Sequence, residues 1–515
     1  MFIFLLQIRH IAIGSGPLYL FAVFSAIVWL LWFIKVDLSR RYRAWTEPYR
    51  TTTSVIVPVV DEPADMFREV LDRIVAQQPT ELIVVVNGPR NHRLEAVCAE
   101  LGVGWIWTPK AGKRNAIRLG VEAATGDIVV LVDSDTVWTA ETLAELVKPF
   151  ADAAIGGVTT RQRILDHDRC LITRWADWLE NTRALYMMPA QSVLGHVGCL
   201  PGRTIAFRRE ILQQIMDRFL TERFLGVFLE ISDDRTLTNL TLRAGYRTAY
   251  QVTSLVYTEA PTTVRRLYRQ QLRWARGSQY NTLRMLPWML TYAPMLAVFF
   301  LADIILPFLL LGVGIGWAYR AATGTGANLY AAILKEYGMQ AGLGRVVALA
   351  LVASMLSMGV RQLRHLSERP SDFLRLPAFI LVSTLFLMPV RLLGFFRMAH
   401  VSGWGTRAHA YGGTDHDAAA AVAGTQRTEV PHPAELVRAG SVGEVAPVTA
   451  GGGAAGEPAG DRLADPAGPP GPGAQAARPS AGHQPARVRW RPNPQAAWPY
   501  LIGSTLIVLE VLHHA

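Results

Sequence analysis

The sequence has few charged residues and very little lysine. Asp, Glu, Lys and Arg together make up 18% of the 515 residues, whereas half of all residues are hydrophobic. This composition excludes a wholly disordered chain and is not typical of an ordinary soluble enzyme. Lysine occurs only at Lys35, Lys110, Lys113, Lys148 and Lys335. Each lysine is therefore more informative than an average arginine.

Cysteine is also scarce. Cys98, Cys170 and Cys199 lie far apart in the sequence and form no Cys-x-x-Cys pair. Their number and spacing exclude a disulfide framework and favour a reducing compartment around the water-soluble part of the chain.

The net charge of +10 could indicate nucleic-acid binding, but the basic residues stand mainly beside apolar runs. That distribution is the one that the positive-inside rule describes for membrane proteins, so nucleic acid is not expected as a partner. Residues 17–34 are uncharged and about long enough to cross a bilayer. Lys35 and Arg40 follow them. Residues 1–36 are thus predicted to contain a retained signal anchor, with the chain entering the cytoplasm after it.

Residues 51–258 alternate between strand-like and helix-like patterns. Strands are predicted at 54–60, 82–86, 104–108 and 127–132, and helices at 66–76 and 114–124. Such alternation predicts an α/β domain with a mostly parallel sheet, in which ligands bind beyond the carboxyl ends of the strands. Polar clusters follow three of these strands: Asp61-Glu62, Asn87-Gly88 and Asp133-Ser134-Asp135.

The remainder of the chain changes character several times. Residues 259–290 mix arginines with aromatic and aliphatic residues, which is typical of an amphipathic helix on an anionic membrane face. Within residues 291–400, apolar stretches at about 292–318, 345–360 and 376–397 are near spanning length. Residues 411–497 are rich in Ala, Gly and Pro and are predicted to be disordered, and a short apolar segment follows at 498–513.

The first two motifs of the predicted site along the chain can each be interpreted in two ways. Asp133-Ser134-Asp135 directly follows a buried strand, so its carboxylates either converge on Mg²⁺ or Mn²⁺ or form a turn or helix N-cap. The segment from Lys110 to Asn115 opens a helix with two lysines. It either binds a diphosphate or is a solvated basic turn.

Two further motifs follow in the chain. Ser232-Asp233-Asp234 begins a helix, where either an acid acts as a general base or Ser232 is the N-cap with the two acids in the first turn. Gln270, Arg273 and Trp274 share one helix face by their spacing. They suit a sugar and a phosphate, or alternatively a helix at the membrane interface.

In this order, the motifs resemble the processive family 2 glycosyltransferases, which include hyaluronan, chitin and cellulose synthases. The resemblance covers about residues 18–410, including residues 404–407, and is closest to hyaluronan synthase-like members at 232–239, 245–246 and 270–277. It implies a GT-A (Rossmann-like) α/β domain in the cytosol, joined to a bundle of transmembrane helices and interfacial helices.

The resemblance also implies roles for individual residues. Asp135 would bind Mg²⁺ or Mn²⁺, and Asp234 would be the catalytic base, with Asp233 and Asp133 beside it. The residues implied to bind the nucleotide sugar are Val57, Glu62, Asn87, Lys113, Asp133, Gln270, Arg273 and Trp274. Those implied to contact the acceptor are Cys199, Gly202, Arg203 and Trp274. The chain departs from the family pattern at Asn87, where many relatives have aspartate, and at Ser232, where hyaluronan synthases usually have glycine.

The implied function is that of an inverting hexosyltransferase, multi-pass in the plasma membrane with its catalytic domain in the cytoplasm. It would polymerise a β-linked polysaccharide from UDP-sugars and couple synthesis to export, with the growing polysaccharide and membrane lipids as partners. The sugar, the linkage and the oligomeric state stay open. The alternative is a non-processive enzyme that moves one sugar to a lipid carrier. That reaction needs Asp-x-Asp and a membrane anchor but not the motif from Gln270 to Trp274.

Overall fold

The computed structural model describes residues 17–228, 231–323 and 329–399. The predictions for residues 400–515 lie outside these ranges. They include the tail at 411–497, the apolar segment at 498–513 and the motif at 404–407. The first part of the N-terminal segment, residues 1–16, lies outside them as well.

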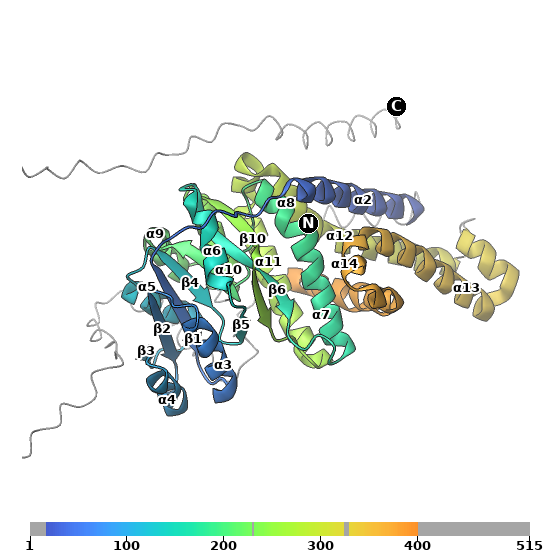
Figure 1. Cartoon of the computed structure of the whole chain (residues 1–515). Coiled ribbons are helices and arrows are strands. Elements are labelled where there is room, and N and C mark those ends of the chain that lie inside the picture. The colour runs from blue at the N-terminus through green and yellow to red at the C-terminus, as the bar shows by residue number, and fades with distance from the viewer. Residues whose placement is uncertain (1–16, 229–230, 324–328, 400–515) are drawn as a thin grey trace, which may run out of the picture.

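An eight-stranded sheet forms the centre of the described residues, with the strand order β3-β2-β1-β4-β7-β6-β10-β5 (Figure 1). Strands β3, β2, β1 and β4 are mutually parallel, β7 is antiparallel to both of its neighbours, and β10 is again parallel to β6. The strands of this sheet are β1 (Thr53–Val59), β2 (Glu81–Asn87), β3 (Gly104–Thr108), β4 (Ile128–Val132), β5 (Thr136–Trp138), β6 (Ile155–Ile164), β7 (Thr204–Arg208) and β10 (Arg247–Thr258). All four predicted strands are present.

The two faces of the sheet bury alternate residues of each strand, as the two-residue period of a strand requires. Val55, Val57 and Val59 of β1 pack towards α3 (Ala64–Val75), α4 (His92–Glu100) and α6 (Thr142–Val147). Ile56, between them, packs towards α5 (Lys113–Ala123) and α9 (Arg209–Leu220) on the opposite face. Helices therefore cover both faces of the sheet, and the carboxyl ends of β1, β2 and β4 are where a ligand can bind.

The remaining helices connect the sheet to the apolar end of the molecule. They are α2 (Pro17–Arg41), α7 (Leu171–Thr182), α8 (Met188–Val193), α10 (Asp233–Arg243), α11 (Val264–Tyr292), α12 (Pro294–Thr323), α13 (Leu329–Arg361), α14 (Leu363–Glu368), α15 (Leu376–Leu381) and α16 (Met388–Phe396). Shorter 3₁₀ and π turns are η1 (Lys148–Ala151), η2 (Arg183–Met187), η3 (Pro370–Arg375) and η4 (Val382–Leu387), and a small hairpin consists of β8 (Arg223–Phe224) and β9 (Val227–Phe228).

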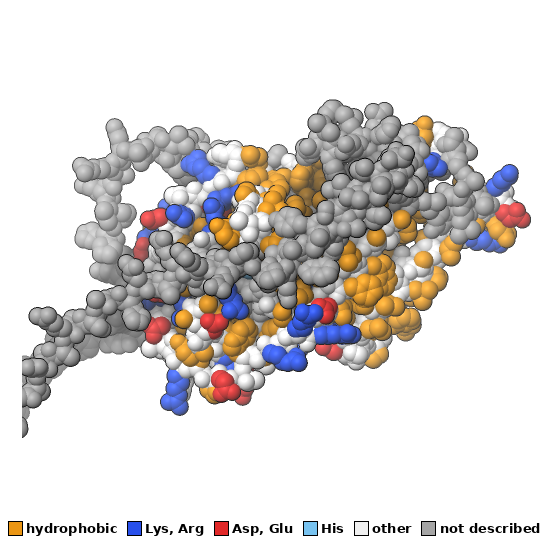
Figure 2. All heavy atoms as spheres, turned by 90° about the horizontal axis from the view of Figure 1, so that it is seen from above, with side chains coloured by type: hydrophobic (Ala, Val, Ile, Leu, Met, Phe, Trp, Pro, Cys, Tyr) orange, Lys and Arg blue, Asp and Glu red, His pale blue; other side chains and the backbone are white. Residues whose placement is uncertain are grey.

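Among the described residues, four helical stretches are long and apolar enough to cross a membrane: Leu20–Arg41, Pro294–Arg320, Ile333–Arg361 and Pro370–Phe396. Helix α2 packs on α8 and α12, and α11 packs on α12 and α16. Figure 1 shows α2, α12 and α13 extending away from the sheet, and Figure 2 shows hydrophobic side chains gathered over this end. The apolar helices thus stand beside the α/β unit rather than around it.

Helix α5 approaches the sheet at Gly120, where a side chain has no room. A Cβ atom built there would lie 2.5 Å from Cγ2 of Ile56. We expect Gly120→Ala to lower the free energy of unfolding by about 1–3 kcal/mol, because overpacking displaces the helix from β1. The measurement is the thermal unfolding midpoint of the purified protein.

The matched control for this prediction is Gly344→Ala in α13. No atom lies within 4 Å of a Cβ at Gly344, so that variant should keep or slightly raise the midpoint. Equal midpoints for the two variants would contradict the packing described for Gly120.

Candidate active site

A cleft opens at the carboxyl end of β1 and β4, where loops from distant parts of the chain meet. Strands β1 and β4 are paired in parallel, so the residues that follow them lie at the same edge of the sheet. The cavity at this edge is lined by Pro58, Lys113, Ile117, Leu131, Val132, Asp133, Gly202, Ile205, Asp233, Asp234 and Leu237. Acidic, cationic and apolar groups from five separate segments thus share one cavity.

Lys113 and Asp133 form an ion pair inside this first cavity. The distance from Lys113 Nζ to Asp133 Oδ1 is 2.5 Å, which is short for a charge-assisted hydrogen bond. Burial opposes the charge on the ammonium group, but Asp133, Asp233 and Asp234 outweigh it and raise the pKa of Lys113. The cavity therefore keeps a positive charge at the N-terminus of α5, which is where a diphosphate would be stabilised.

The central residue of Asp133-Ser134-Asp135 is attached to the end of β1. Ser134 Oγ donates a hydrogen bond to Glu62 Oε1 at 2.6 Å, and Glu62 Oε2 accepts one from Val60 N at 2.8 Å. Glu62 is buried, so it orders the loop rather than being exposed to solvent. This attachment fixes the backbone between the two aspartates, of which Asp133 lines the first cavity and Asp135 lines neither cavity.

Asp135 lies where a divalent cation would be stabilised. Burial, followed by the charge of Asp133, raises the pKa of Asp135 to about 6, and Arg203 and Lys113 oppose the shift. The part of the chain that the structure describes contains no group of three His, Cys, Asp or Glu residues that could hold a metal. Two neighbouring carboxylates are nevertheless the donor set with which proteins bind Mg²⁺ together with substrate phosphates. The residues present therefore fit a shared, substrate-assisted metal site.

Asn87, which is predicted to contact a nucleotide, lies at the end of β2 beside the turn that precedes Lys113. Its Nδ2 donates to Val59 O at 2.9 Å, and its Oδ1 accepts from Gly112 N at 3.2 Å. Gly112 has φ 131°, a conformation that glycine tolerates best. Asn87 thus joins the end of β1 to the turn that presents Lys113.

Val57, which is predicted to line the nucleotide pocket, does not line either cavity. It is fully buried in the core on the α3 face of the sheet. The next residue, Pro58, points the other way and lines the first cavity. The period of two in β1 accounts for the difference.

The two acids at the start of α10 have different surroundings. Asp234 is half-buried, and its Oδ2 accepts a hydrogen bond from Gly202 N at 3.2 Å while Oδ1 accepts one from Arg235 N at 2.7 Å. Asp233 is buried, and its Oδ1 lies 3.1 Å from Nε of Arg114. Burial raises the pKa of Asp233 against the opposing charge of Arg114. Asp234 is therefore the better placed of the two to accept a proton from a ligand.

A second cavity adjoins the first through the loop that contains Gly202 and Arg203. Trp274 and Gln270 of α11 line it together with Arg203. The guanidinium carbon of Arg203 lies 5.8 Å from the centre of the Trp274 ring, and its Nη1 lies 3.2 Å from Glu180 Oε1. An indole beside polar and charged groups is suited to stack against a sugar ring.

The other predicted residues of this region lie outside the two cavities. Arg273 is half-buried on α11 and does not line either of them. Cys199 precedes the shared loop, and burial, followed by the charge of Asp234, raises the pKa of its thiol to about 12. At neutral pH the thiol is protonated, so Cys199 contributes packing rather than a nucleophile.

Three residues of the site are not evident from the sequence. Arg114 binds Asp233 and also lies 3.1 Å from Glu222, while Glu180 lies 3.0 Å from Arg183 as well as near Arg203. An arginine in an arginine-rich chain and an acid inside an amphipathic helix give no local signal. The pairs of Arg114 with Asp233 and Glu222 and of Glu180 with Arg203 join separate segments of the chain, so the structure is needed to reveal them.

Helix α11 approaches α10 closely at Gly277. A Cβ atom there would lie 2.7 Å from Cβ of Ser232, so only glycine fits without a shift. Ser232 is at the N-cap position of α10, as one interpretation predicted, but its side chain makes no capping hydrogen bond and its φ is 64°. This left-handed conformation favours glycine, and glycine is the residue usual at this position in hyaluronan synthases.

The comparisons with known sequences agree with one another. Residues 50–277 match the family model described as "Glycosyltransferase like family 2". The chain is 26% identical over 388 residues to hyaluronan synthase of Streptococcus pyogenes, an alignment that covers 73% of this chain and 88% of that protein. It is 32% identical over 269 residues to an N-acetylglucosaminyltransferase of Rhizobium meliloti (strain 1021), which covers 49% of this chain and 62% of that protein.

A solved structure shows the same fold. It is a mannosyltransferase from Pyrobaculum calidifontis in complex with GDP-Man and Mn²⁺, with a TM-score of 0.51 and 22% sequence identity. The match covers 74% of this chain and 99% of that chain. Together with the family match, it confirms the predicted GT-A fold. The four apolar helices and the similarity to hyaluronan synthase identify a membrane protein.

Arg114 offers a direct test of how the cleft is held together. Arg114→Met removes the arginine that pairs with buried Asp233 and leaves buried Glu222 with Arg284 alone, which should cost about 3–5 kcal/mol of unfolding free energy. The control is Arg118→Met on the same helix, where the ion pair with Glu122 is exposed and should contribute about 1 kcal/mol or less. Denaturant unfolding of both variants measures the difference, and similar losses would contradict the assignment.

Proposed function

Because residues 50–277 are a glycosyltransferase family 2 domain, we propose that the chain is an inverting, membrane-integrated enzyme that polymerises a β-linked polysaccharide from UDP-sugars. The observation that carries the proposal is the cleft in which Asp234 lies beside the Lys113–Asp133 ion pair and opens through Gly202 towards Trp274. This arrangement supplies a donor site and a base in one cavity and an acceptor site in a second cavity, and the consecutive residues Gly202 and Arg203 line one cavity each.

The first cavity is the proposed donor site. Lys113, at the N-terminus of α5, attracts the diphosphate, and Glu62 and Asn87 hold the two loops between which the nucleotide lies. Asp135 and Asp133 are the proposed ligands of Mg²⁺ or Mn²⁺. The cation, when bound, neutralises charge on the leaving diphosphate.

Asp234 is the proposed general base. It accepts the proton of the acceptor hydroxyl as that oxygen bonds to the anomeric carbon, while the bond from that carbon to the diphosphate oxygen breaks and UDP leaves. Attack from the face opposite the leaving group inverts the configuration. The hydrogen bonds from Gly202 and Arg235 fix the carboxylate without supplying a proton that it could take.

The second cavity is the proposed acceptor site. Trp274 offers a face for the terminal sugar of the growing chain, and Gln270 and Arg203 offer hydrogen-bond donors around it. After each transfer the new terminal sugar must leave the donor site, and a stacked but weakly held ring permits that step. The shared loop at Gly202 and Arg203 places the acceptor beside the base.

The apolar helices are the proposed route for the product. Arg40 and Arg41 end α2, which by the positive-inside rule places the α/β unit on the cytoplasmic side of the plasma membrane. Asp303 of α12 lies 3.8 Å from Arg391 of α16, so polar groups occur between helices that otherwise face lipid. The growing polysaccharide is hydrophilic and requires such a path.

Product analysis tests the proposed reaction. Membranes that contain the enzyme are incubated with Mg²⁺ or Mn²⁺ and with labelled UDP-sugars, singly and in pairs. We expect a long, metal-dependent polymer, and Asp234→Asn should lower the transfer rate by about 10²–10⁴-fold while UDP binding is retained, because asparagine accepts hydrogen bonds but no proton.

Asp65→Asn, at an exposed site in α3, is the matched control and should leave synthesis unchanged. Near-normal turnover of Asp234→Asn would contradict its role as the base. A product of one sugar on a lipid carrier would favour the non-processive alternative, and extractability into organic solvent distinguishes it from a polymer.

Asp135→Ala tests the metal site. Removal of this carboxylate should weaken UDP binding in the presence of Mn²⁺ by about tenfold or more and leave metal-free binding unchanged. Isothermal titration with UDP, with and without Mn²⁺, measures both. Unchanged metal dependence would show that Asp135 is not a ligand.

A further inference from the structure

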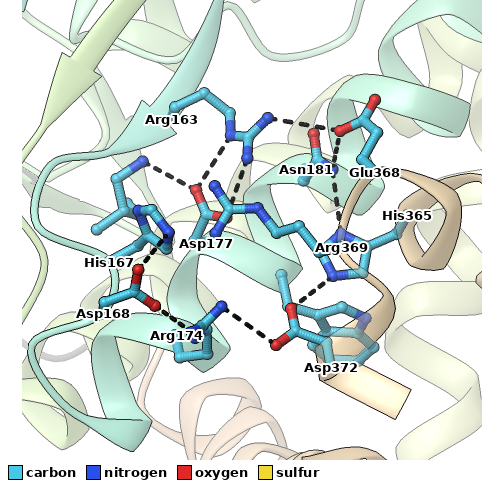
Figure 3. Close-up of polar contacts among 12 residues, drawn as sticks. Arg163, His167, Asp168, Arg174, Asp177, Asn181, His365, Glu368, Arg369 and Asp372 are labelled. Carbon is cyan, nitrogen blue, oxygen red and sulfur yellow. Dashed lines mark hydrogen bonds and ion pairs between the residues drawn. The ribbon is translucent and has the colours of Figure 1, made fainter.

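A buried polar contact joins the α/β unit to His365, which lies between the third and fourth apolar stretches, and to Asp372, near the start of the fourth (Figure 3). Nδ2 of Asn181 lies 3.0 Å from Nδ1 of His365, and Nε2 of His365 lies 3.0 Å from Oδ2 of Asp372. Asn181 and His365 are fully buried, and Asp372 is 1% exposed. We call Asn181, His365 and Asp372 the latch. Asn181 belongs to α7, His365 to α14 and Asp372 to η3.

The surroundings of Asn181 determine which way its amide points. Its Oδ1 accepts a hydrogen bond from Arg161 at 3.1 Å, and its Nδ2 donates one to Glu368 at 2.8 Å. A guanidinium group only donates and a carboxylate only accepts, so the amide cannot be reversed without losing both bonds. Asn181 therefore presents a donor to His365.

This orientation also determines the state of His365. Its Nδ1 must accept from Asn181, so that nitrogen carries no hydrogen, and Nε2 carries one and donates it to Asp372. The latch is complete only with neutral imidazole in this tautomer. If Nδ1 were protonated, it and Nδ2 of Asn181 would both be hydrogen-bond donors, and in this buried site no water could accept a hydrogen bond from either of them.

Charged groups surround the latch on every side. Burial lowers the pKa of His365, Asp372 and Asp177 oppose this, and Arg369 adds to it. The further ion pairs are Asp177 with Arg163 and Arg369, Asp372 with Arg174 and Arg375, and Glu368 with Arg161 and Arg163. Because the pKa is lowered, the native state favours neutral His365. The stability that this provides is complete above the ordinary value of 6.5 and is lost as the pH falls below it.

The latch acts on the helix that forms the wall of the second cavity. Trp175, Leu179 and Glu180 of α7 line that cavity, and Glu180 holds Arg203 at 3.2 Å. Asn181 lies on the adjoining side of the same helix, where Thr182 also donates to Gln362 at 2.8 Å. A shift of α7 would therefore move Glu180, and with it the arginine beside Trp274.

We propose that Asn181 and His365 are positioning residues for the acceptor site: neutral His365 holds α7 in place, and its protonation loosens α7 and shortens the time that a growing chain stays bound. This rests on the proposed function of the second cavity. The residues that are proposed to bind the diphosphate and the cation, Lys113, Asp133 and Asp135, lie on elements other than α7.

The test uses the full-length enzyme in lipid nanodiscs at about pH 7.5 and about pH 5.5, on either side of the ordinary histidine range. Three quantities are measured: the length of the polymer, the affinity for UDP with Mn²⁺, and hydrogen exchange of residues 171–182 and 363–375. At the lower pH we expect polymers about tenfold shorter. We also expect lower protection factors in both segments, that is, faster exchange after correction for the intrinsic pH dependence of amide exchange, because a buried hydrogen bond is lost. UDP affinity should not change with the state of the latch.

Two substitutions distinguish the protonation of His365 from other effects of pH on the enzyme. In His365→Gln, the amide supplies one acceptor for Asn181 and one donor for Asp372 without titrating, so polymer length and the protection factors should not depend on pH. In Asn181→Asp, the carboxylate needs a hydrogen on Nδ1, so the latch should close at low pH and open at high pH, the reverse of the native behaviour. His92→Gln alters an exposed histidine and should behave as the native enzyme.

The results for the two latch variants can contradict the proposal. Native-like pH dependence in both His365→Gln and Asn181→Asp would overturn the proposal, as would a latch variant that changes UDP affinity but not polymer length. If the native enzyme makes no polymer, the proposed function is wrong. The hydrogen-exchange measurements then still test whether protonation of His365 loosens α7. Should Asn181→Asp fail to fold, His365→Gln carries the test.

Discussion

The shape of the cleft depends on one buried guanidinium group. Arg114 lies 3.1 Å from Asp233 and from Glu222, and its Nη1 donates to Phe219 O at 2.5 Å. Glu222 also pairs with Arg284 of α11. A buried charge is tolerated only when it is fully paired, so these contacts force α5, α10 and α11 to meet at one place. Asp234 faces Lys113 because its neighbour Asp233 is held in this way.

The two cavities depend on each other through a short loop. Gly202 donates its backbone N–H to Asp234 in the first cavity, and the adjacent Arg203 contacts Glu180 and lies over Trp274 in the second. A Cβ at Gly202 would lie 3.3 Å from that of Asp234, which leaves little space for any other residue. Donor and acceptor geometry are therefore set by consecutive residues, and a helix that moves Arg203 moves the acceptor relative to the base.

Much of the α/β unit could be predicted because its signals are local. The β-branched runs before Asp61, Asn87 and Asp133 predict the strands, and parallel pairing brings their carboxyl ends to one edge. The apolar stretch predicted at 345–360 is shorter than the helix that contains it, which begins before Arg345, after a kink at Gly338 (φ 73°). Composition alone ends a span at a charge, whereas Arg345 lies within the helix, 3.5 Å from the centre of the Tyr337 ring.

The remainder could not be predicted because it depends on contacts between distant residues. Asn181 and His365 are 184 positions apart, and Arg114 and Asp233 are 119 apart. No periodicity connects them. The left-handed Ser232 likewise follows from the packing of α10 on Gly277 rather than from its own preference, since serine usually caps a helix with its hydroxyl group.

The central claim is that one cleft holds the donor, the base and the acceptor. A cryo-EM structure of the enzyme with UDP, Mn²⁺ and its own product measures this directly. The account predicts the diphosphate beside Lys113 and Asp135, and the terminal sugar on Trp274 with a hydroxyl group within hydrogen-bond reach of Asp234. Nucleotide bound away from this cleft, or a terminal sugar far from Asp234, would contradict it.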